Sequence, residues 1–167
     1  MRASKLGKLN STGYQPISIK DELRRNLRSR LQKGEPILAG ILGFENTNGI
    51  FNYEYLSKID TLTKFLENHA KINMVNSPTN AVRTIRDPLS GALFKKMLLP
   101  VSDTADYEFD STFIFKNYEV FGGLFGNNRQ SLRIIAQHEA KLDEKQADSL
   151  LNEIRTFCEK QDLAPHI

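Results

Sequence analysis

The residues of this chain best suited to bind a metal or carry a proton are its three histidines, His69, His138 and His166. A zinc site needs three or four convergent ligands, drawn from histidine, cysteine and carboxylate side chains at short spacings. None of the three histidines has a second ligand-type residue at such a spacing on the same predicted face. The His138-Glu139 pair also lacks the second histidine of a zinc-protease helix. The sequence therefore predicts no metal site.

Four acidic residues crowd one short stretch: Asp103, Asp106, Glu108 and Asp110. A calcium loop would need a different spacing, a central glycine and a terminal glutamate, all of which are missing. A solvated acidic loop is the simpler interpretation. The serine-hydrolase pattern Gly-x-Ser-x-Gly does not occur either. We therefore expect no catalytic residue and no enzymatic activity.

Two further features could indicate a reactive thiol and a phosphate-binding loop. Cys158 is the single cysteine, and its place on an apolar helix face predicts a buried structural thiol. Gly122, Gly123 and Gly126 form a glycine-rich stretch, but it lacks the lysine and the hydroxyl residue of a phosphate-binding loop. The sequence therefore predicts no nucleotide or other cofactor.

Charge is distributed unevenly along the chain. Residues 1–34 hold nine of the 23 basic residues and two of the 20 acidic ones, so their net charge is +7 and that of the remainder is −4. Leu23, Leu27 and Leu31 predict a helix over residues 18–33 with a narrow apolar stripe. The arginines on its other faces could contact phosphates of nucleic acid or an anionic membrane: Arg24, Arg25 and Arg28. No aromatic residue accompanies them to stack on bases, so a solvated helix is the simpler interpretation.

Hydrophobic periodicity after residue 47 predicts alternating elements. We expect helices near 53–68, 106–118 and 143–161, strands near 71–77, 131–138 and 163–167, and a β-hairpin around Asp87–Gly91. This order indicates an α+β fold, with two helices on one face of a mostly antiparallel sheet, close to the split βαβ, ferredoxin-like arrangement.

The apolar run Ile37–Phe44 is too short to cross a bilayer, which takes about 20 residues. Its continuous apolar character is typical of a buried strand, and we expect it to occupy a position in the sheet. No signal or membrane-spanning segment is evident, so the chain by itself is expected in the cytoplasm, without direct membrane insertion.

Several segments resemble the porter domain of exporters of the RND superfamily, MMPL type. Residues 48–63 read NGIFNYEYLSKIDTLT, residues 75–81 read VNSPTNA, residues 85–91 read IRDPLSG, and residues 126–132 read GNNRQSL. The resemblance implies ferredoxin-like βαβ subdomains, a non-catalytic role, and the rest of the transporter as partner. It also implies an inner-membrane parent with an extracytoplasmic porter domain that moves lipids or other hydrophobic substrates.

Residues 1–46 resemble a different family, the N-terminus of MoxR-like, magnesium-chelatase-type AAA+ ATPases. The similar segments are Gly13-Tyr14, Lys20–Leu27, Gly34-Glu35-Pro36 and Gly40–Thr47. The two resemblances divide the chain into an N-terminal extension, 1–46, and a porter-like domain, 47–167. The principal expectation is a fragment or chimera of an exporter. An ATPase fragment without its phosphate-binding loop and a basic adaptor that binds nucleic acid are the alternatives.

Aromatic residues concentrate between positions 109 and 125. Phe113, Phe115, Phe121 and Phe125 could face a hydrophobic substrate or a partner, as in exporter porter domains, although core packing explains them more simply. We expect part of this apolar surface, with Leu124, to be exposed and to cause self-association.

Overall fold

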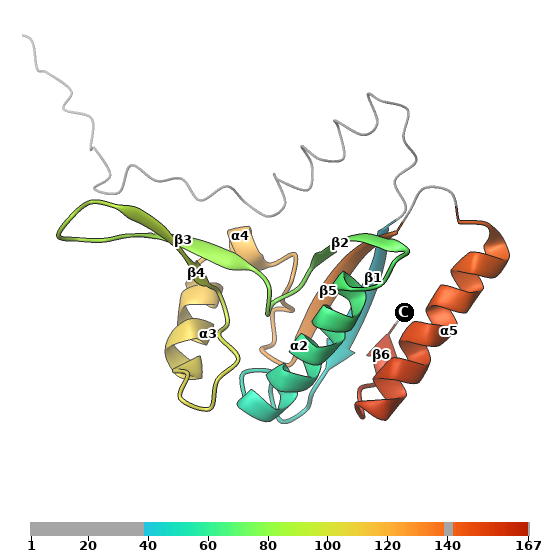
Figure 1. The fold of residues 1–167 in the computed structure, drawn as a ribbon. Helices are drawn as coiled ribbons and strands as arrows, with labels where there is room; N and C mark the ends of the chain where they lie inside the picture. Colours follow the sequence, from blue (N-terminus) through green and yellow to red (C-terminus); the bar gives the residue numbers. More distant parts are fainter. Residues whose placement is uncertain (1–38, 139–141, 167) are drawn as a thin grey trace, which may run out of the picture.

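The computed structural model describes residues 39–138 and 142–166, so the expected basic helix over 18–33 lies outside the described residues. The described part is an α+β structure with a four-stranded and a two-stranded antiparallel sheet. Helices α2 and α5 lie along the larger sheet, while the smaller sheet extends away from it (Figure 1).

The elements follow one another in an order close to the expected one. They are β1 (Ala39–Glu45), α2 (Tyr53–Glu67), β2 (Ile72–Asn76), β3 (Val82–Arg86), β4 (Leu93–Met97), α3 (Tyr107–Lys116), α4 (Tyr118–Phe121), β5 (Ser131–His138), α5 (Glu144–Lys160) and β6 (Pro165–His166). The α+β class and the hairpin are confirmed. The sequence did not indicate the short helix α4.

The larger sheet has the strand order β2-β5-β1-β6, and every neighbouring pair in it is antiparallel. Strands β1 and β5 form its centre, with seven residue pairs from Ala39↔Gln137 to Glu45↔Ser131. The two central strands thus come from parts of the chain that lie far apart in the sequence.

Strand β1 confirms that the apolar run before residue 45 occupies a sheet position, for residues 39–44; positions 37 and 38 lie outside the described residues. Successive side chains of a strand point to opposite faces. Accordingly Leu42 and Phe44 are 3% and 1% exposed, whereas Ile41 is 57% exposed. Although β1 falls within residues 1–46, it belongs to the same sheet as β5.

Local capping interactions determine where the two long helices begin. Asn52 caps α2 by accepting a hydrogen bond from the Tyr55 amide at 2.9 Å. The preceding Gly49 has a φ of +86°, a conformation that glycine adopts most readily. Helix α5 begins with a capping box between Asp143 and Gln146.

The two helices pack against each other and cover the apolar face of the sheet. Phe65 of α2 stacks on Phe157 of α5, with ring centroids 4.1 Å apart. Leu56, Ile59, Leu62 and Leu66 of α2 are fully buried. Leu150, Ile154 and Cys158 supply the corresponding face of α5. Cys158 is buried as expected, and burial raises the pKa of its thiol to about 11.

The register of β1 generates the first prediction. Phe44→Ala should lower the free energy of unfolding by about 3–5 kcal/mol, because it removes a fully buried ring and leaves a cavity. Ile41→Ala, three residues away on the exposed side, should cost less than about 1 kcal/mol. Urea unfolding of both variants measures the difference. Equal losses would show that β1 does not have this register.

Candidate functional site

The aromatic residues expected to face a substrate or partner lie largely inside the protein. Phe125 is 0% and Phe121 5% exposed, while Phe113 and Phe115 are half-buried. Phe51 stacks on Phe125 and meets Phe115 edge-on, with ring centroids 6.0 Å and 6.1 Å apart. Phe113 and Phe121 form a second group, with ring centroids 6.0 Å apart.

Leu124 is also 0% exposed. The prediction that Phe121, Leu124 and Phe125 form part of an exposed apolar surface is therefore wrong. The segment after α4 folds back along β5: the Arg133 amide donates to the Leu124 carbonyl at 2.8 Å, and Phe125 forms a β-bridge with Leu132. This return directs all three side chains into the core.

An ion pair that the sequence did not indicate lies beside Phe113. Arg83 of β3 donates from Nη2 to Asp110 Oδ1 of α3 at 3.3 Å, and the two residues are only 8% and 5% exposed. The Arg83 guanidinium also lies 4.6 Å from the centroid of Phe113. The pair therefore connects the hairpin to α3 within an apolar environment.

Asp110 stands apart from the other residues of the acidic stretch. Asp103, Asp106 and Glu108 are exposed, as expected for solvated carboxylates, whereas Asp110 is buried. Burial raises the pKa of the Asp110 carboxyl above its usual value of 3.8, although the positive charges of Arg83 and Lys96 oppose the shift. The sequence contained a signal for the burial of Asp110, because Asp110, Phe113 and Ile114 lie on one face of a helix.

No group of three histidine, cysteine or acidic side chains that could hold a metal ion occurs among residues 39–138 and 142–166. His69 instead pairs with Glu153, Nε2 to Oε2 at 3.1 Å, and connects the end of α2 to α5. His138 ends β5 and His166 lies in β6. The arginines Arg24, Arg25 and Arg28 lie outside the described residues.

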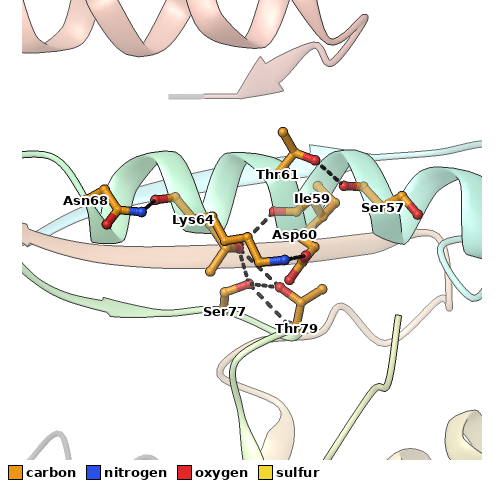
Figure 2. Close-up of polar contacts among 9 residues, drawn as sticks. Ser57, Ile59, Asp60, Thr61, Lys64, Asn68, Ser77 and Thr79 are labelled. Carbon is orange, nitrogen blue, oxygen red and sulfur yellow. Dashed lines mark hydrogen bonds and ion pairs between the residues drawn. The ribbon is translucent and has the colours of Figure 1, made fainter. Parts of the chain in front are cut away.

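A buried hydroxyl cluster, formed by Thr63, Ser77 and Thr79, joins α2 to the turn after β2 (Figure 2). Thr63 donates to the Ile59 carbonyl at 2.8 Å and lies 2.7 Å from Ser77 Oγ. Thr79 is 3.1 Å from Ser77 and 3.2 Å from Thr63, oxygen to oxygen. All three residues are 0–1% exposed.

The partners of the hydroxyl cluster indicate a structural role. A nucleophilic serine requires a neighbouring base, yet in the described chain Ser77 Oγ contacts only other hydroxyls and the Thr79 amide. Asn80 completes the turn: its amide group donates to Glu67 and to the Val75 carbonyl, and its oxygen accepts from the Ser77 amide. The cluster therefore holds this turn against α2.

The strongest candidate for a ligand site is an apolar cavity of about 200 Å³ between α5 and the sheet. Its apolar lining comes from β1, β2, β5 and α5 and includes Leu42, Ile72, Ala136, Ala147, Leu150 and Ile154. Such a lining suits a small apolar molecule or a short alkyl chain, because binding would remove apolar surface from water.

No protein-family model matches this chain, and neither a curated protein nor a solved structure matches it. In the part of the chain that the structure describes, no helix has the length and apolar character needed to cross a membrane.

The hydroxyl cluster generates the second prediction. Thr63→Val should reduce the free energy of unfolding by about 1–3 kcal/mol, because Ser77 and Thr79 lose a buried hydrogen-bonding partner. Thr61 is a matched control on the same helix: it is exposed and its hydroxyl donates to the Ser57 carbonyl (Figure 2). Thr61→Val should change stability by less than about 0.5 kcal/mol. Equal effects in denaturant titrations would contradict a special role for the cluster.

Asp110 generates the third prediction, which concerns pH. Because its pKa is higher in the folded protein than the usual 3.8, the folded state binds this proton more tightly than the unfolded state. The resulting stabilisation is present below pH 3.8 and is lost as the pH rises through the pKa that Asp110 has in the folded protein. Asp110→Asn removes the titration while preserving the side-chain shape. The stability of the parent relative to this variant should therefore fall with rising pH, measured by urea unfolding between about pH 3 and 7. A rise would contradict the assignment.

Proposed function

We propose that the domain expected over residues 47–167, with β1 as a further strand of its sheet, forms a ferredoxin-like porter subdomain of an RND/MMPL-type exporter. Its role is non-catalytic: it contributes to the passage of a hydrophobic substrate, or to the packing of neighbouring subdomains, within the complete transporter. The rest of that transporter is its functional partner, and the parent's porter domain is extracytoplasmic.

The observation that carries this proposal is the interleaving of two strand–helix–strand units. The first unit is β1-α2-β2 and the second is β5-α5-β6. In the sheet order β2-β5-β1-β6, strands of the first unit alternate with strands of the second. A split βαβ arrangement requires such interleaving, and the interleaving therefore supports the proposal. The hairpin and α3–α4 are then an insertion between the two units.

Two of the segments that resemble the exporter family contain residues that stabilise turns. Gly49 and Asn52 form the turn that begins α2. The Asp87 carboxylate accepts hydrogen bonds from the Leu89 and Ser90 amides and organises the hairpin turn, which Gly91 completes with a φ of +70°. These roles suit a module that positions surfaces, because each residue supports geometry and none is placed for a reaction.

The apolar cavity supplies a place where a hydrophobic substrate could contact this subdomain. Its lining is almost entirely aliphatic and includes Gly40, Ile41 and Leu42 of β1, a central strand of the sheet. The alternatives, an ATPase fragment and a nucleic-acid adaptor, depend on residues 1–46, of which only 39–46 are described. Those residues form a sheet strand and a turn here, and no observed contact favours either alternative.

The fourth prediction tests the proposed contact with hydrophobic compounds. N-phenyl-1-naphthylamine should bind the purified chain with a saturable fluorescence increase, because the cavity offers an apolar environment. Ala147→Phe should abolish that binding by placing a ring in the cavity, whereas Ala164→Phe, at an exposed position away from the cavity lining, should leave it unchanged.

Two measurements distinguish the alternatives: calorimetric titration with magnesium ATP, and retention of double-stranded DNA at increasing salt concentration. The proposal predicts no heat of binding with magnesium ATP and no salt-dependent retention of double-stranded DNA. Saturable nucleotide binding would favour the ATPase alternative, and DNA binding that weakens steeply with salt would favour the adaptor. Probe fluorescence that Ala147→Phe leaves intact would contradict the role of the cavity.

A further inference from the structure

Exposed apolar side chains concentrate on one part of the molecule. Six of the eight large hydrophobic residues exposed in the described chain belong to the hairpin or to α3: Val82, Leu89, Leu93, Phe94, Met97 and Phe109. Every residue of β4 is exposed. Figure 1 shows the hairpin extending beyond the larger sheet, with α3 beside it. A projection with this much apolar surface is typical of an interaction site.

The register of the hairpin shows which of these side chains share a face. Val82 pairs with Met97, Thr84 with Lys95, and Arg86 with Leu93. Directly paired residues of antiparallel strands lie on the same face. We call these six residues the hairpin face. The opposite face contains Arg83, which is held by Asp110 of α3.

The hairpin face is both apolar and basic. Val82, Leu93 and Met97 are 46%, 55% and 40% exposed, and the exposed basic residues Arg86 and Lys95 lie among them. No acidic residue belongs to this face. An occupant must therefore combine apolar and acidic groups.

The same molecule carries a surface of that complementary type at the start of α3. Phe109 is 58% exposed, and the exposed acidic residues Asp106 and Glu108 precede it in the same helical turn. Its ring centroid lies 5.8 Å from the Arg83 guanidinium. We call Asp106, Glu108 and Phe109 the α3 surface. One copy thus presents an apolar basic face and an apolar acidic surface, and the Arg83–Asp110 ion pair connects the elements that carry them.

We propose that two copies of this chain associate with two-fold symmetry, the hairpin face of each packing on the α3 surface of the other. In a two-fold interface every contact occurs twice, so both complementary surfaces of each copy are used and association stops at the dimer. Packing hairpin face on hairpin face would instead bring two Lys95 side chains together. Lys95 and Lys96 also make β4 a poor edge for further strand addition.

Charge reversal tests this pairing with the full-length chain. Sedimentation velocity should show a dimer for the parent protein. Lys95→Glu and Glu108→Lys should each weaken dimerisation at least about tenfold, because each brings like charges together twice per dimer. Glu144→Lys and Lys145→Glu on α5, both exposed, are the matched controls and should leave the dimer unchanged. Circular dichroism checks that every variant is folded.

Mixing the two variants gives the decisive result. In an equimolar mixture of Lys95→Glu and Glu108→Lys chains, both contacts of the mixed dimer again join opposite charges, so dimerisation should return. The double variant should likewise dimerise with itself. A monomeric parent protein at about 100 μM, open-ended polymers, or a mixture that stays monomeric would overturn the proposal.

Discussion

The structure depends on the pairing of β1 with β5, two strands that lie far apart in the sequence. Their shared face carries Leu42, Phe44, Leu132 and Ile134, all nearly inaccessible to water. Burying this face requires α2 and α5 to lie against it, and the two helices then meet at Phe65 and Phe157. The entropic cost of closing so long a loop must be offset by this common core. The remaining elements are arranged around it.

Polar groups inside the structure determine its geometry more than its stability. A buried ion pair such as Arg83–Asp110 contributes little net stability, because removing two charges from water costs about as much as their attraction returns. Arg83 Nε also lacks a hydrogen-bonding partner among the described residues. The pair nevertheless connects β3 of the hairpin to α3 at a defined buried contact. The hydroxyl cluster has the same effect on the turn after β2, where its members satisfy one another.

The sequence predicted those features that depend on local pattern. Helices α2 and α5 follow from apolar residues at helical spacing and from their caps, Asn52 and Asp143. The strand before residue 45 follows from its continuous apolar run. The pairing of Arg83 with Asp110 could not be predicted, because it joins residues distant in sequence. The exposure expected at Phe121, Leu124 and Phe125 was wrong for a similar reason: their burial depends on how the chain returns along β5 after α4.

The central role of the β1–β5 pair is tested most directly by native-state hydrogen exchange on the full chain, because the most protected amides identify the last structure to open. The slowest exchange should occur in residues 41–44 and 132–136, and the β3–β4 hairpin should exchange by local opening at much lower free energy. A hairpin, or a segment within residues 18–33, that exchanges more slowly than β1 and β5 would contradict this account.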